Sequence, residues 1–125
     1  FELRLLREPT RDPNALWTEL TQRYLNVRPH PEVPWWAMRV QLVDDPGYMV
    51  NYGLGAVLTA EMRARTAAAV GSFDTGNARW YPWLSEQLLR FGAERDTATL
   101  MRDFLGRDPS PDALLAELRR IGGSP

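Results

Sequence analysis

Helix start and stop signals recur along the whole chain and constrain its fold more than any other feature. Asp12 precedes Pro13 and Asp45 precedes Pro46, and Asp96 and the pair Ser110 and Pro111 are further start signals. A carboxylate or hydroxyl caps the free N–H groups at a helix start, and proline is best tolerated in the first turn. Glycines that can end a helix follow the apolar segments, at Gly71, Gly92, Gly106 and Gly122.

Between these signals the apolar residues recur at helical spacing, as Leu16, Leu20 and Tyr24 do within residues 11–27. Further helices are predicted from about residue 32 or 34 to 42, from 45 to 71, from about 79 to 91, from 96 to 106 and from 110 to 122. Only residues 1–6, FELRLL, also fit the alternation of a strand. The sequence therefore predicts an all-α fold, an irregular helical bundle formed as a single domain over residues 1–125.

The charge balance argues against a basic binding surface. The 15 basic and 16 acidic residues are spread along the chain, without the basic stripe or polybasic end that nucleic acids and anionic lipids bind. We therefore expect neither nucleic acid nor a membrane as a partner. The chain has no signal-peptide pattern, and we expect a cytoplasmic protein. All basic residues except one histidine are arginine, which favours a GC-rich bacterial genome.

The stretch PGYMVNYGLGAVLTAEMR, residues 46–63, contains the most informative pattern. In a helix with about 3.6 residues per turn, Tyr48, Tyr52 and Gly55 share one face. A glycine inside a helix costs about 1 kcal/mol relative to alanine, so Gly53 and Gly55 need a compensating close approach. Either another helix packs against this backbone, or a ligand lies there beside the two phenols. Spacing alone leaves both interpretations open.

The same stretch resembles the Gly-Tyr-Phe-Pro-Thr-Tyr-Thr-Leu-Gly segment of zinc metallocarboxypeptidases of the carboxypeptidase Taq type. Matching positions are Gly47, Tyr48, Tyr52, Leu54 and Gly55, whereas residues 49–51 depart from the family pattern. The segment WYPWLSEQLLRFGAERDTATLMRDFLGRDPSPDALLAELRRI is similar to the closing helices of those enzymes and of the thimet oligopeptidase and oligoendopeptidase group. The resemblance covers about residues 46–121.

This resemblance implies a larger, mainly α-helical metallopeptidase that hydrolyses peptide bonds. Such enzymes bind one zinc ion through H-E-x-x-H and a downstream glutamate. Their Gly-Tyr helix contributes tyrosines that hydrogen-bond the peptide substrate. By the resemblance, Tyr48, Tyr52 and Gly55 are the substrate-binding residues of this chain. A phenol suits this role because it is a neutral hydrogen-bond donor at pH 7.

The chain has no H-E-x-x-H, and its one histidine, His30, lies in a proline-rich loop. We therefore expect no catalytic residue and no metal ligand within it, and zinc only in a longer parent protein with an N-terminal catalytic half. The chain then reads as a C-terminal fragment, inactive alone. Tryptophans that pack against the missing half would be exposed in the fragment and cause self-association, and the candidates are Trp17, Trp35, Trp36, Trp80 and Trp83. The alternative is a free-standing helical interaction domain without catalysis.

Overall fold

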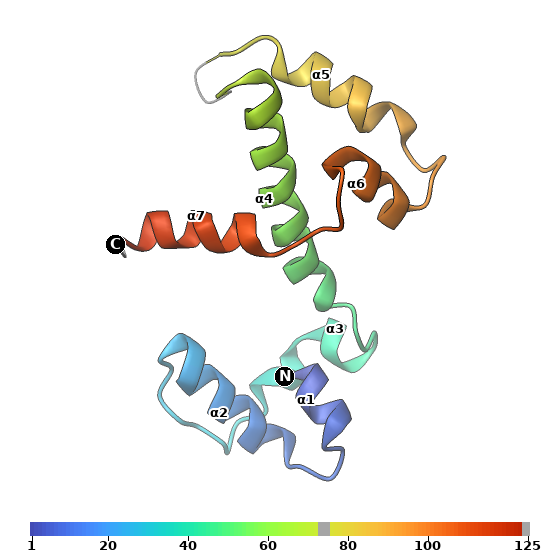
Figure 1. Cartoon of the computed structure of the whole chain (residues 1–125). Coiled ribbons are helices and arrows are strands. Elements are labelled where there is room, and N and C mark those ends of the chain that lie inside the picture. The colour runs from blue at the N-terminus through green and yellow to red at the C-terminus, as the bar shows by residue number, and fades with distance from the viewer. Residues whose placement is uncertain (73–75, 124–125) are drawn as a thin grey trace. The chain divides into compact units, whose positions relative to one another are not determined.

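The computed structural model describes residues 1–72 and 76–123. Within these ranges the chain forms seven α-helices and two 3-10 helices and has no strand, so the predicted all-α class is confirmed. The helices are, in chain order, α1 (Glu2–Arg7), α2 (Pro13–Leu25), η1 (Trp35–Met38), α3 (Val40–Val43), α4 (Val50–Val70), α5 (Trp80–Gln87), η2 (Leu89–Phe91), α6 (Thr97–Leu105) and α7 (Asp112–Gly122) (Figure 1). No helix in the described ranges is long and apolar enough to cross a membrane.

The chain divides into two compact units, Phe1–Tyr52 (unit 1) and Gly53–Pro125 (unit 2). The boundary falls inside α4, whose first three residues belong to unit 1. The expected single domain over residues 1–125 therefore stays a prediction, which unfolding measurements can test.

Aromatic rings hold unit 1 together. The ring of Phe1 meets the ring of Trp17 edge-on at 5.3 Å between centroids and stacks on Trp36 at 5.8 Å. The indole Nε1–H of Trp36 donates to Asn14 Oδ1 at 2.7 Å. These contacts fasten η1 to the start of α2. Leu16 of α2 is fully buried.

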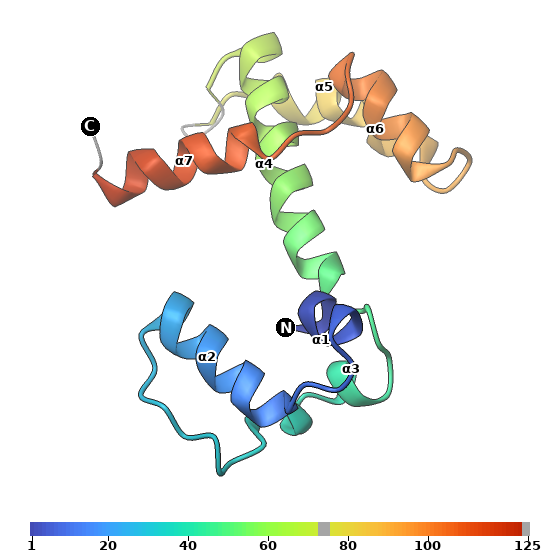
Figure 2. The same cartoon turned by 60° about the horizontal axis from the view of Figure 1, so that its bottom comes forward.

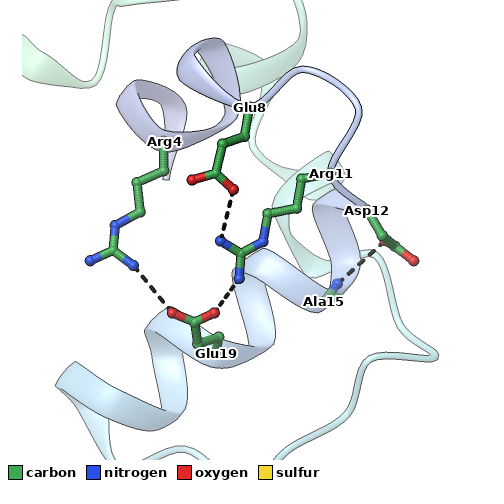
Figure 3. Close-up of polar contacts among 6 residues, drawn as sticks. All are labelled: Arg4, Glu8, Arg11, Asp12, Ala15 and Glu19. Carbon is green, nitrogen blue, oxygen red and sulfur yellow. Dashed lines mark hydrogen bonds and ion pairs between the residues drawn. The ribbon is translucent and has the colours of Figure 1, made fainter.

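Charged side chains also link α1 to α2 (Figure 3). Glu19 accepts from Arg4 at 3.2 Å and from Arg11, which also contacts Glu8 at 3.3 Å. Exposed pairs of this kind contribute little individually, about 0–1 kcal/mol each. The shared carboxylate of Glu19 connects α1 and the loop after it to α2.

The core of unit 2 lies where α4, α5 and α6 meet. Its most buried residues come from the segment between α5 and η2 and from α6, and are Leu88, Leu100, Met101 and Phe104. Leu58 and Met62 of α4 and Trp83 of α5 pack against them. Leu58 and Met62 thus bring α4 into this core, whereas Leu54 is exposed.

Helix α7 presents its apolar side outward. It extends away from α5 and α6 in both views (Figures 1 and 2). Glu117 and Arg120 line a cavity of about 300 Å³ beside the small residues Ala60, Ala64 and Ala67 of α4. The apolar side chains of Leu115, Leu118 and Ile121 are exposed.

Several helix boundaries differ from the predictions. Residues 1–6 form most of α1 and no strand, because the N-terminal turn packs onto α2 through Phe1. The helix predicted up to residue 42 is broken at Arg39, which has an extended backbone between η1 and α3. The predicted start at Asp45 is wrong: α4 begins at Val50, because Gly47 adopts φ +92° and the preceding residues form turns.

Candidate functional site

The two predicted substrate-binding tyrosines lie together at the start of α4. Tyr48 is in the turn that precedes the helix, and Tyr52 is in its first turn. Their rings meet edge-on at 5.9 Å between centroids. The side chains are largely open to solvent, with Tyr48 41% and Tyr52 60% exposed. Both phenols are therefore available to a ligand.

A hydrogen bond from the other end of unit 1 fixes this turn. The backbone N–H of Gly47 donates to Glu2 Oε1 of α1 at 2.6 Å. Gly47 has a positive φ, which a residue with a Cβ rarely adopts. The glycine of the Gly-Tyr pair thus has a conformational role, and it ties Tyr48 and Tyr52 to α1.

Tyr52 lines a cleft within unit 1, of about 570 Å³, which we call the Tyr52 cleft. Its walls are mostly apolar and come from α1, α2, α3 and the start of α4. The lining residues are Phe1, Glu2, Trp17, Leu25, Arg39, Gln41, Leu42, Met49 and Tyr52. Neither Tyr48 nor Gly55 is among them. The structure therefore brings one of the three predicted site residues to a cleft of ligand-binding size.

The polar groups of the Tyr52 cleft are mainly hydrogen-bond donors. Arg39, Gln41 and Tyr52 each offer N–H or O–H groups, and Glu2 is the one acid among the lining residues. One oxygen of Glu2 already accepts from Gly47. Within the described residues Arg39 forms no ion pair. The cleft thus suits a ligand with carbonyl or carboxylate oxygens and apolar side chains.

Gly53 and Gly55 are exposed, and nothing in the described residues packs against them. A Cβ built on either glycine would have no other heavy atom within 4 Å. Close packing of a helix of this chain, the first interpretation of these glycines, is therefore not what the structure shows. The second interpretation, a ligand beside the phenols, stays a prediction.

The described residues do not fit a zinc site. They contain no group of three or more His, Cys, Asp or Glu side chains that could hold a metal ion. His30 Nδ1 lies 2.8 Å from the carbonyl oxygen of Arg28, and its ring contacts Trp35 at 6.0 Å. The histidine therefore packs locally within its loop.

Sequence reasoning missed most of the cleft. The cleft combines Phe1, Trp17, Arg39 and Gln41 from three separate segments, and the hydrogen bond between Trp36 and Asn14 connects η1, next to α3, with α2. One signal was available in the sequence, since Arg39 is a lone charge within the apolar run WWAMRVQLV.

Comparison of the chain with protein-family models, curated proteins and solved structures finds no match.

Proposed function

We propose that this chain forms one wall of the substrate cleft of a zinc-dependent metallopeptidase, with unit 1 contacting the peptide. The observation that carries the proposal is the place of Tyr52. The phenol that the family resemblance assigns to substrate binding lines a cleft of about 570 Å³ with aromatic and aliphatic walls. The cleft beside Tyr52 supports the peptidase proposal over the alternative of an interaction domain, whereas the open space at Gly53 and Gly55 is compatible with both a peptide and a partner helix.

The chemistry of the cleft suits a peptide. Apolar walls formed by Phe1, Trp17 and Met49 accommodate a side chain, and the donors Arg39, Gln41 and Tyr52 accommodate backbone oxygens. The Tyr52 hydroxyl is a neutral donor that strengthens its hydrogen bond as a carbonyl oxygen gains charge. Tyr52 is accordingly the residue to which we assign substrate contact.

The metal must come from elsewhere in this proposal. Because the described residues lack a ligand group for zinc, the H-E-x-x-H motif would belong to an N-terminal catalytic half outside these 125 residues. Zinc would supply the activation of the attacking water there. The present chain would bind and orient the peptide and would not cleave it alone.

The first test is the mass and N-terminal sequence of the protein as the cell produces it, compared with the reading frame upstream of Phe1. A longer product with H-E-x-x-H supports the proposal. Its zinc-dependent peptide cleavage should then fall about 10- to 100-fold in kcat/KM for Tyr52→Phe. Tyr81→Phe, at an exposed tyrosine of α5, is the matched control and should leave cleavage unchanged. A natural product that begins near Phe1 and lacks the motif would refute the proposal.

A non-catalytic interaction domain is the second candidate, and one observation favours it. The outward apolar face of α7, formed by Leu115, Leu118 and Ile121, offers a surface that a partner helix could cover. Only the peptidase proposal requires an upstream H-E-x-x-H motif. The N-terminal sequence of the natural product therefore separates them.

A further inference from the structure

We infer that α7 pairs with α7 of a second copy of this chain, and that the two helices lie antiparallel across a two-fold axis. The inference goes beyond the proposed function, because it concerns only α7 (Asp112–Gly122) of unit 2 and no residue of the Tyr52 cleft. It names one occupant for the exposed apolar face of this helix.

The apolar face of α7 is the first argument. Leu114, Leu118 and Ile121 follow one another at spacings of four and three residues, which place them along one stripe of the helix. Leu115 lies beside the stripe, and Leu115, Leu118 and Ile121 are all exposed. Three exposed apolar side chains on one short helix form a patch that a second apolar surface can cover.

The other side chains of α7 divide between the two sides of this face. Ala113, Glu117 and Arg120 line the cavity of about 300 Å³ beside α4. By helical spacing Asp112 and Arg119 lie on the opposite side, and both are exposed. Neither forms an ion pair within the described residues. The side of the apolar face away from α4 therefore carries one acid near the start of the helix and one arginine near its end.

These two charges complement each other in an antiparallel pair, which is the second argument. Asp112 and Arg119 are seven residues apart, or about two helical turns. An antiparallel second helix presents the same side, so its Arg119 lies opposite Asp112 of the first helix, and the reverse holds by symmetry. The same arrangement lays Leu114 of one copy against Leu118 of the other. A parallel second helix would present the side that carries Glu117, and the two charges would not meet.

The length of α7 sets the strength of this pair. The helix has 11 residues and is about 16 Å long at 1.5 Å per residue. Two helices of this length bury much less than the about 1,600 Å² of a stable interface, so the dimer is weak. We expect a dissociation constant of about 0.1–1 mM, which is within reach of NMR titration.

The test reverses one charge in each of two variants of the complete chain. Asp112→Arg has two arginines on this side of α7, and Arg119→Asp has two acids. Each variant alone should associate about tenfold more weakly than wild type at low salt, because both symmetry-related contacts become repulsive. ¹⁵N-labelled Asp112→Arg should bind unlabelled Arg119→Asp about tenfold more tightly than it binds unlabelled Asp112→Arg, since every arginine then lies opposite an acid.

The mixed pair controls for the stability of the helix itself. An arginine near the start of a helix and an acid near its end are both unfavourable to the helix dipole. The mixed pair contains one altered helix of each kind, so this cost equals the mean of the costs in the two variants' own pairs. Circular dichroism checks that both variants remain helical.

A second mixture controls for net charge. Glu94→Arg and Arg28→Asp make the same changes of charge at exposed residues outside α7. Their mixture should associate no more tightly than the mean of these two variants alone. An equal gain in this control would show a general attraction between oppositely charged chains and would overturn the inference.

The outcomes for the α7 variants decide the arrangement. A mixed pair about tenfold tighter than either variant's own pair supports the antiparallel dimer. A mixed pair no tighter than the mean of the two would overturn it, even where wild type associates. No association of wild type at about 1 mM would overturn the second copy as the occupant and assign the face to a different partner protein.

Discussion

Gly53 and Gly55 have open space where a side chain would begin, and this makes them informative positions. A Cβ on either would meet no other group within 4 Å. Because alanine restricts the unfolded chain and favours the helix, Gly53→Ala and Gly55→Ala should each stabilise the protein by about 0.5–1 kcal/mol. Urea unfolding followed by circular dichroism measures this. Gly106→Ala, at φ +73°, is the control and should destabilise.

The same two variants test the role assigned to Gly55. By helical spacing Gly55 shares the face of Tyr52, and Gly53 does not. If Gly55 leaves room for a substrate, its alanine variant should weaken peptide binding while Gly53→Ala does not. Equal affinities for the two variants would remove Gly55 from the substrate-binding residues.

Glu61 is a buried carboxylate whose partners lie in the loop between α6 and α7. It is 1% exposed and accepts from Arg107 at 2.7 Å and from the backbone N–H of Ser110 at 3.2 Å. Removing the arginine leaves a buried charge with one weak donor. Because Arg107 is half-exposed and partly screened, Arg107→Ala should destabilise unit 2 by about 2 kcal/mol in urea unfolding.

Arg119→Ala is the matched control for this prediction. Arg119 is exposed on α7 and forms no ion pair within the described residues. Its loss should change the free energy of unfolding by less than about 0.5 kcal/mol. Equal changes in the free energy of unfolding for the two variants would mean that the contact between Arg107 and Glu61 does not stabilise the fold.

The candidate site was only partly predictable at the residue scale. Tyr48 and Tyr52 belong to a short local sequence pattern, and such a pattern can be recognised without knowledge of the tertiary structure. Arg39 and Trp17 line the same cleft but are 22 residues apart in sequence. Their meeting depends on the bond between Trp36 and Asn14, which no spacing rule contains.

Among the elements, α6 has a cap that responds to pH. Asp96 accepts from the backbone N–H of Thr99 at 2.9 Å, and this hydrogen bond holds the pKa of Asp96 below its ordinary value. A carboxyl with a depressed pKa in the folded state stabilises the protein above its unfolded pKa, about 3.9. That contribution should be lost as the pH falls through the lower, folded pKa.

Asp96→Asn isolates this effect, because asparagine also caps a helix but does not titrate. The wild-type melting temperature should exceed that of Asp96→Asn by a margin that is constant near neutrality. The margin should shrink below about pH 4. A margin that does not change with pH would show that the charge of Asp96 plays no part in the cap.

Helix boundaries were predictable from the sequence where a local cap sets them. They were not predictable where contacts with distant segments set them. Asp12 caps α2 as predicted, accepting from the N–H groups of Asn14 and Ala15. The same signal at Asp45 does not start a helix, because Gly47 adopts φ +92° and residues 46–49 form a turn. Residues 2–6 are helical, and the preceding Phe1 packs on Trp17, a contact that their own pattern does not encode.

The exposed apolar face of α7, formed by Leu115, Leu118 and Ile121, predicts that the protein self-associates. The sequence also predicts self-association, but through exposed tryptophans. Leu118 lies at the middle of this face and is 55% exposed. Burying a leucine contributes about 1.5–3 kcal/mol, so Leu118→Glu should weaken self-association at least about tenfold in sedimentation equilibrium. Ala116→Glu adds the same charge to the same helix off the apolar face and is the control. Unchanged association of Leu118→Glu would exclude this face.

At the scale of the whole chain, length and apolar content indicate one domain, and contacts divide it into two units. The division falls between Tyr52 and Gly53, within α4. Glycine is the poorest helix former after proline, so Gly53 and Gly55 weaken α4 where the units join. The sequence indicates that α4 is weak at these two glycines. It does not indicate whether the chain unfolds as one domain or as two, since that depends on how strongly each unit is stabilised by its own contacts.

Unfolding of individual residues in urea, followed by NMR, decides between one domain and two. Leu16 and Thr18 report on unit 1, and Leu100 and Phe104 report on unit 2, since all four are buried. Helix formation is cooperative, so loss of either unit removes neighbouring turns of α4 from the other, and we expect one shared transition. Separate midpoints would show two domains. In that case Gly53→Ala with Gly55→Ala should bring the midpoints closer, because a stiffer α4 transmits the unfolding of one unit to the other.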